Sequence, residues 1–220
     1  MRPARLLTFS GLLSFNGGFV DVACFFGLKG LLAAHITGNL ATLCASIVLG
    51  TRGLLSKMLA VPEFVVIVAL THVAGHVLKA AGRPAPRILL GVEVLLLSAF
   101  LALVARYAPF ADPDSTTAML TALAAIAAMA VQNGVQRAHL PQLPPTTFMT
   151  GNATQFGLDV IDVMQRRASP QVAARFRHVL LNLVCFAVGC AAAASMFWAV
   201  GFACVALTIP VAIAAVALTP

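Results

Sequence analysis

Charged residues are scarce in this sequence: Asp, Glu, Lys and Arg make up only 10% of its 220 residues, whereas an ordinary soluble domain has about 25%. Apolar residues make up 60%. This balance excludes an ordinary soluble domain and indicates an integral membrane protein. A spanning helix needs about 20 mainly apolar residues. The stretch 179–218 contains no charged residue and is long enough for two spans.

Several kinds of binding motif are also missing. The five cysteines lie in apolar segments without a CxxC or Cys/His spacing, so we expect neither a disulfide nor a zinc site. His72 and His76 are one helical turn apart, but no third ligand is identifiable, and we expect neither a metal nor a cofactor. The basic residues lie between apolar segments, as the positive-inside rule requires, so we expect no nucleic-acid partner.

The usual catalytic motifs are missing as well. The sequence has no GxSxG, HExxH or P-loop motif and no convincing acid/base pair beside a nucleophile. We therefore expect that the protein is not an enzyme and that any transport is passive or ion-driven. The first apolar segment is interrupted by Asn16 and Asp21 and has no clear cleavage site, so we interpret it as a retained helix rather than a signal peptide.

Apolar runs separated by proline- and glycine-rich breaks predict an all-α, polytopic transmembrane bundle with eight helical segments. Proline-rich breaks at 82–86, 107–115 and 139–147 divide several of the segments. The expected helices are 9–28, 38–55, 62–81, 87–106, 115–137, 149–166, 175–197 and 199–218.

A polar triplet occurs twice in this apolar chain, as Thr37-Gly38-Asn39 and Thr150-Gly151-Asn152, and the two copies are separated by roughly half of the sequence. The segments "GGFVDV" and "AVQNGV" each end at the same distance before their triplet. Gly75 and Gly189 have nearly the same separation as the two triplets. This nearly constant spacing predicts an internal duplication, with half-repeats at 1–109 and 110–220, an organisation that many secondary transporters share.

The motifs also resemble those of a known family. "GGFVDVACFFGL" and "HITGN" in the first half, with "AVQNGVQR", "FMTGN" and "LDVID" in the second, resemble the DUF1275 family, also called the YoaK-like or UPF0700 membrane proteins. The resemblance covers nearly the whole chain. It implies a bacterial inner-membrane protein with about six spans, and it implies no activity.

Two arrangements of the spans remain open. Segment 149–166 is too polar to face lipid because it carries Asn152, Asp159 and Asp162. If both triplet segments are re-entrant or broken, the chain has six spans and inverted halves; if both cross, it has eight spans and parallel halves. We favour six. We expect the N-terminus in the cytoplasm, and both arrangements then place the C-terminus there too.

The triplets suggest a binding site. Thr or Asn is a good N-cap and glycine permits a sharp turn, so each triplet could begin a helix inside the membrane and present unpaired N–H groups to a polar ligand. The alternative is that each triplet only lets two helices pack closely and satisfies its own backbone. Asp21 is a further candidate because a carboxylate at that depth is costly, and its counterpart in the second half is Asn133, beside Gln132. The candidate substrate-binding residues are Asp21, Thr37, Gly38, Asn39, Gln132, Asn133, Thr150, Gly151 and Asn152, with Asn16, Glu93 and Asp159 as secondary candidates.

The sequence therefore favours a small secondary transporter or channel-like protein for a small polar solute or a proton. A structural or regulatory membrane protein without a substrate is the alternative, and a membrane-embedded enzyme is less favoured. The partner that we expect is the lipid bilayer, and alanine-rich faces such as "GCAAAAS" would permit the close packing of a homo-oligomer.

Overall fold

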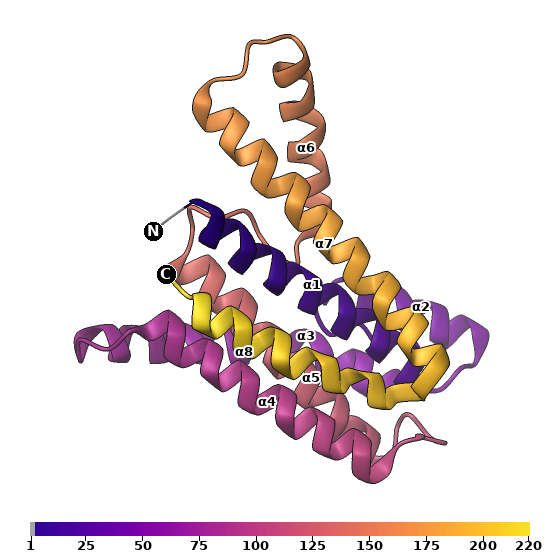
Figure 1. Cartoon of the computed structure of the whole chain (residues 1–220). Coiled ribbons are helices and arrows are strands. Elements are labelled where there is room, and N and C mark those ends of the chain that lie inside the picture. Colours follow the sequence, from indigo (N-terminus) through magenta and orange to yellow (C-terminus); the bar gives the residue numbers. More distant parts are fainter. Residues whose placement is uncertain (1–2) are drawn as a thin grey trace.

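A computed structural model describes residues 3–220, and it describes the side chains from Ala4 onwards. The described residues form helices and no strands, as the apolar runs predict (Figure 1). The helices are α1 (Pro3–Gly27), α2 (Gly38–Leu49), α3 (Leu54–Ala80), α4 (Ala85–Tyr107), α5 (Thr116–His139), α6 (Met149–Met164), α7 (Pro170–Val200), the short 3-10 helix η1 (Gly201–Leu207) and α8 (Thr208–Leu218).

Glycines in the left-handed conformation set two of the boundaries that differ from expectation. Helix α2 ends at Leu49 rather than at 55 because Gly50 turns the chain with a φ of 63°. Gly53, with a φ of 91°, then precedes α3, which starts at Leu54 and contains Pro62 instead of beginning there. Two positive-φ glycines thus make a tight turn between α2 and α3.

Five helical stretches are long and apolar enough to cross a membrane, among the residues described: four are α1, α3, α4 and α5, and the fifth is Pro170–Leu218. The fifth stretch bends at Gly201, and α8 runs back from the end of α7 (Figure 1). The prediction of an all-helical protein with several helices long and apolar enough to span a membrane is confirmed. The count of six spans with two broken helices stays a prediction.

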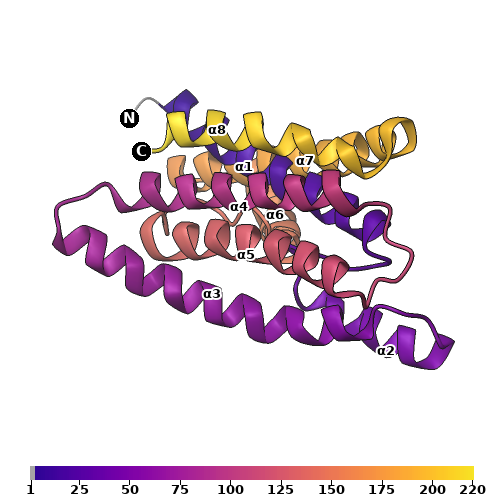
Figure 2. The same cartoon turned by 90° about the horizontal axis from the view of Figure 1, so that it is seen from below.

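The long helices run in two opposite directions. In Figures 1 and 2, α1, α4 and the more inclined α7 run one way, whereas α3, α5 and α8 run the other way. Both chain ends and the α3–α4 turn lie at one end of the bundle. The 108–115 loop and η1 lie at the opposite end.

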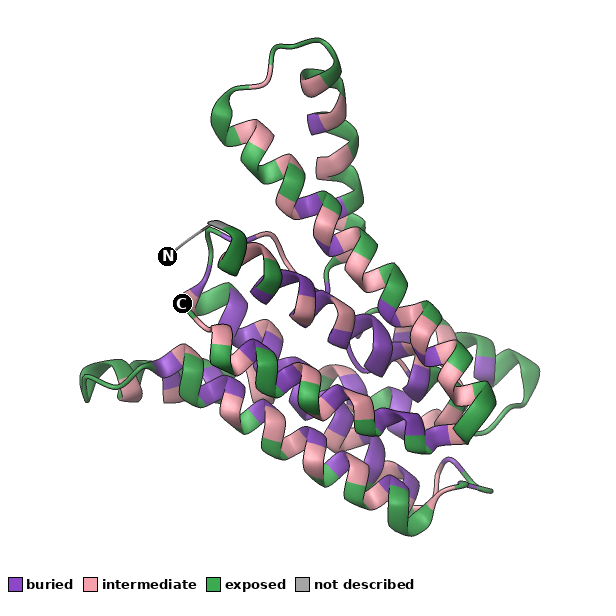
Figure 3. Cartoon of the chain, in the orientation of Figure 1, coloured by how far each residue is buried: buried purple, intermediate pink, exposed green. Residues whose placement is uncertain are grey.

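Helices α1 and α5 form the centre of the bundle. In the most apolar 18-residue stretch of each of these helices, 72% is buried, against 22% in α3 and 33% in α4. Helix α1 packs against α7 and α8, and α5 packs against α3 and α4. In the predicted repeat, α5 corresponds to α1, and its neighbours α3 and α4 correspond to α7 and α8, the neighbours of α1. Buried residues therefore concentrate along these two helices, as the purple segments of Figure 3 show.

The two triplet helices lie at the periphery. Among the described helices, α2 packs only against α3, and α6 packs only against α7, so the two triplet helices do not contact each other. With 12 and 16 residues they extend about 18 and 24 Å at 1.5 Å per residue, which is less than the roughly 30 Å of a bilayer core. Their length argues against the alternative in which both cross the membrane.

Candidate functional site

The loops that precede α2 and α6 meet at one pocket of about 470 Å³. Residues 34–37 come from the first half of the chain, and residues 147–150 come from the second. The separation between each of these four positions and its counterpart equals the separation of the two triplets. The pocket is therefore lined by the same four positions of both predicted half-repeats.

The remaining wall comes from α3, α5 and the proline-rich loop after α5. Helix α3 contributes Phe64 and Val68, and α5 contributes Asn133, Gln136 and Arg137. The titratable side chains among the lining residues are His35 and Arg137, and no carboxylate is among them. The pocket thus combines apolar walls with a few polar groups, a composition typical of small-molecule sites.

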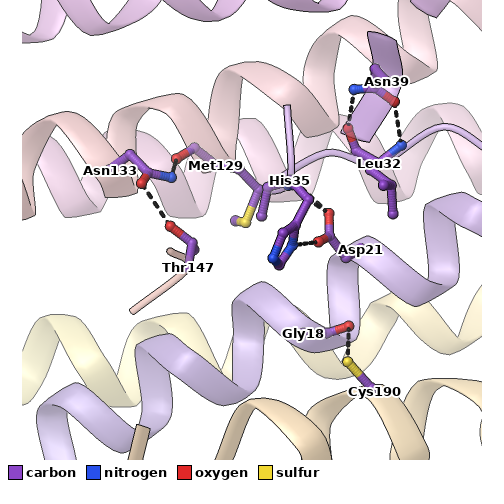
Figure 4. Close-up of polar contacts among 10 residues, drawn as sticks. Gly18, Asp21, Leu32, His35, Asn39, Met129, Asn133, Thr147 and Cys190 are labelled. Carbon is purple, nitrogen blue, oxygen red and sulfur yellow. Dashed lines mark hydrogen bonds and ion pairs between the residues drawn. The ribbon is translucent and has the colours of Figure 1, made fainter. Parts of the chain in front are cut away.

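Asp21 of α1 holds the first loop in place (Figure 4). Its carboxylate is only 2% exposed and accepts hydrogen bonds from the backbone N–H groups of Ala34 and His35, at 2.6 and 3.3 Å. The other oxygen lies 2.5 Å from Nδ1 of His35. Asp21 does not line the pocket, so it is a positioning residue for a loop that does.

His35 is one residue of this site that the sequence interpretation missed. Its Nδ1 faces Asp21, and its ring meets Phe186 edge-on at 5.3 Å, so Nε2 is the ring nitrogen left for a ligand in the pocket. The hydrogen bond to Asp21 raises the pKa of this imidazole above its usual value, and the nearby negative charge acts in the same direction. The available signal was a histidine just before the triplet, in the same half of the chain as a lone carboxylate.

The second loop is held by amides of α5 instead of a carboxylate. Asn133 accepts a hydrogen bond from the Thr147 hydroxyl at 2.6 Å, as Figure 4 shows. Gln136 accepts from the N–H and the hydroxyl of Thr146, at 2.9 and 2.8 Å, and Gln132 donates to that hydroxyl at 3.0 Å. Gln132 and Asn133 therefore hold this loop, whereas Asp21 holds the first.

The chemistry of the loops explains this difference. The second loop contains three prolines, which lack an N–H group, and it therefore presents carbonyl oxygens that need donors. Asn182 of α7 donates to the carbonyls of Pro144 and Pro145, and Gln136 donates to that of Pro144. The first loop offers N–H groups and needs an acceptor, which Asp21 supplies. Gln136 and Asn182 were also missed, because neither occupies the place that corresponds to Asp21 in the predicted second half.

The triplet asparagines brace their own loops. Asn39 donates to the carbonyl of Leu32 at 2.7 Å and accepts from its N–H at 2.8 Å. Asn152 donates to the carbonyl of Pro145 at 2.6 Å. Both asparagines reach back along the chain by the same number of positions, so their carbonyl partners occupy equivalent places in the two halves.

The triplets lie at the starts of their helices, but they do not cap them with side-chain hydrogen bonds. Thr37 makes no side-chain cap to α2, and the residue that caps α6 is Phe148, also without a side-chain bond. The N–H groups of Gly38 and Asn39 donate to the carbonyls of His35 and Ile36, because the chain already turns there. The start of α2 therefore does not offer these N–H groups to an anion.

The triplet glycines permit a close approach of side chains. A Cβ atom on Gly38 would lie 2.7 Å from Cδ1 of Leu32, and one on Gly151 would lie 2.5 Å from Cε1 of Phe148. Both contacts are shorter than real Cβ atoms show, so a larger residue would require the side chains of Leu32 and Phe148 to move. Of the nine predicted binding residues, Thr37, Asn133 and Thr150 line the pocket, and the other six support it from outside.

The secondary candidates lie away from the pocket. Asn16 of α1 and Glu93 of α4 are buried in the core, with Nδ2 of Asn16 3.5 Å from the Glu93 carboxylate. His72 and His76 approach to 3.1 Å through their Nε2 atoms. No group of three or more His, Cys, Asp or Glu side chains in the described part of the chain could hold a metal ion.

Asp159 is paired within the α6–α7 hairpin. Its partner is Arg175 of α7, at 2.6 and 2.9 Å, with a further bond from Gln155. The side chain of Asp159 points towards α7 and is 1% exposed. The Arg175 hydrogen bonds lower the pKa of the Asp159 carboxyl. Asp159 therefore fastens α6 to α7.

Comparison with known proteins identifies the family but no function. No curated protein and no solved structure matches the chain. A family model described as "Protein of unknown function (DUF1275)" matches residues 9–219, nearly the whole sequence. The motifs quoted above had already indicated this family. The chain therefore belongs to the DUF1275 family of proteins of unknown function.

Proposed function

We propose that this protein is a small secondary transporter or channel-like protein, and that the pocket between the two triplet loops holds its small polar solute. The observation that carries the proposal is the composition of the pocket wall: residues 34–37 and their counterparts 147–150 line a single cavity. Sites formed where two structural repeats meet are characteristic of secondary transporters.

The helix directions support six crossings with inverted halves. Helices α1 and α5 run in opposite directions, as do their expected counterparts α3 and α7, and α4 and α8. Six crossings require this alternation, whereas eight crossings would make each such pair parallel. The two loops would then enter the bilayer from opposite sides and reach the pocket with helices too short to span.

The charge distribution supports cytoplasmic termini in the bacterial inner membrane. Arg83 lies in the α3–α4 turn and Arg87 in the first turn of α4, at the same end as both chain ends. Asp112 and Asp114 belong to the loop at the opposite end. An excess of Lys and Arg marks cytoplasmic loops, so the end with the termini faces the cytoplasm.

The bracing role of the asparagines favours the alternative of a structural or regulatory membrane protein. Asn39 and Asn152 hold backbone and do not line the pocket, as a purely structural or regulatory membrane protein would also require. An enzyme is less well supported, because no Ser, Cys, Asp or Glu side chain lines the pocket as a nucleophile or acid.

Uptake into liposomes tests the transport function. We would compare entry of radiolabelled glycerol, alanine, butyrate and choline, which are neutral, zwitterionic, anionic and cationic, into protein-containing and protein-free liposomes. We expect accelerated entry of at least one solute, and slower entry with Thr150→Val. Ser195→Ala is the matched control, because Ser195 is exposed and bonds only its own helix. Entry of all four solutes at the protein-free rate would contradict transport.

A further inference from the structure

The polar side chains of the pocket fall into two groups. Asn133 and Gln136 are already engaged by the protein: Asn133 accepts from Thr147 and donates to the carbonyl of Met129 at 2.9 Å, and Gln136 accepts from Thr146 and donates to the carbonyl of Pro144, which leaves each amide one N–H donor. Four polar groups of the pocket lining make no hydrogen bond to the described part of the protein. They are the side chains of Thr37, Thr150 and Arg137, and Nε2 of His35.

The second group is rich in hydrogen-bond donors. Arg137 is an exposed guanidinium in the last turn of α5, and it has five N–H donors and no acceptor. With Nδ1 of His35 held by Asp21, a proton on Nε2 gives an imidazolium that donates towards the pocket. The buried carboxylate beside it favours that form. The two threonine hydroxyls can also donate.

No acidic side chain in the described part of the chain satisfies Arg137. The ion pairs among the described residues join Asp21 to His35, Asp112 to Arg52 and Asp159 to Arg175. Asp114 accepts from backbone N–H groups of the α2–α3 turn, and Glu93 lies in the core beside Asn16. A ligand with an acceptor-only anionic group would complement the guanidinium and the imidazolium.

The rest of the wall is apolar. Phe64 and Val68 of α3 and Leu143 of the second loop line the cavity, and an apolar group there is removed from water. We propose that the pocket binds a small monocarboxylate, with its carboxylate between Arg137 and His35 and its short apolar tail against α3. This inference rests on the proposed function, because it assigns the substrate class to the same pocket.

Three ligands of similar shape test the proposed class. Butyrate, butyramide and n-butylammonium would be titrated against the full-length protein in lipid nanodiscs by calorimetry, at matched ionic strength. We expect butyrate to bind at least about tenfold more tightly than butyramide, because hydrogen bonds to charged groups are the strong ones. We expect no heat from n-butylammonium. Equal binding of butyrate and butyramide would overturn the proposal, and so would preferred binding of the ammonium.

A pair of arginine variants separates the site from general surface charge. Arg137→Gln should weaken butyrate binding at least about tenfold. Arg87→Gln should leave it unchanged, because Arg87 is also exposed and lies outside the pocket lining. Wild-type affinity in Arg137→Gln, with an unchanged melting temperature, would contradict the assignment of Arg137.

The two proposals fail in different ways. Butyrate that binds but does not enter liposomes would refute transport and leave the carboxylate site standing. Entry of glycerol or alanine without any butyrate binding would leave transport standing and refute the carboxylate site. Absence of both binding and entry would refute both.

Discussion

Removal of the Asp21 carboxylate should release the first triplet loop. In Asp21→Ala, the buried N–H of Ala34 loses a partner at 2.6 Å, and the N–H of His35 loses a weaker one at 3.3 Å. A buried polar group left unpaired costs about 1–3 kcal/mol. The His35 side chain is 33% exposed, so water replaces part of its loss. We therefore expect a destabilisation of about 2–4 kcal/mol.

The melting temperature in detergent or nanodiscs measures this effect. For a protein of this size about 1 kcal/mol corresponds to roughly 2–4 °C, so Asp21→Ala should lower the melting temperature by about 5–15 °C. Asp21→Asn is the matched control, because its amide oxygen can still accept from both N–H groups. We expect it to lose a third or less of that amount. Equal, small losses in the two variants would refute the idea that Asp21 holds the loop.

Three further perturbations test other parts of the structure. Asn39→Ala and Asn152→Ala should each destabilise the protein by about 1–3 kcal/mol, because each leaves a loop carbonyl without its donor; a melting temperature unchanged in both would exclude the bracing role. His35 has a pKa raised above its ordinary value of 6.5. Its stabilising contribution, measured as wild type minus His35→Gln, should be fully present below pH 6.5 and disappear as the pH rises through the raised pKa; a difference that grows with pH would contradict the pair with Asp21. Asp159→Asn should expose the turn between α6 and α7 to proteolysis while leaving butyrate affinity unchanged, since Asp159 binds Arg175 outside the pocket; reduced affinity without increased cleavage would contradict this role.

The fold class could be predicted from the sequence because composition and apolar run length largely determine it. Runs of about 20 apolar residues separated by proline and glycine have few alternatives to a helical bundle in a bilayer. The exact ends could not be predicted. The end of α2 depends on Gly50 adopting a φ of 63°, and nothing in "IVLGTRGLL" states which glycine turns first.

The site was predicted in part, and the errors have a physical cause. The triplets do mark the two loops that meet at the pocket, and Asp21 and Asn133 do act on those loops. Asn39 bonds its own loop instead of capping α2, because a side-chain amide can bond backward to a loop as readily as forward to a helix start. His35 was missed because its significance depends on a contact with Asp21, and only the fold brings these two side chains together.

The most direct test of the central claim is the side of the membrane on which each triplet helix ends. Single cysteines introduced as Thr51→Cys and Ser169→Cys, after replacement of the five native cysteines, would be labelled on intact cells with a membrane-impermeant thiol reagent. Thr51 lies between α2 and α3, and Ser169 lies between α6 and α7. Inverted halves with two re-entrant loops predict labelling of Thr51→Cys from outside and protection of Ser169→Cys until the cells are opened. Protection of both positions would mean eight crossings with parallel halves, and would contradict loops that reach the pocket from opposite sides.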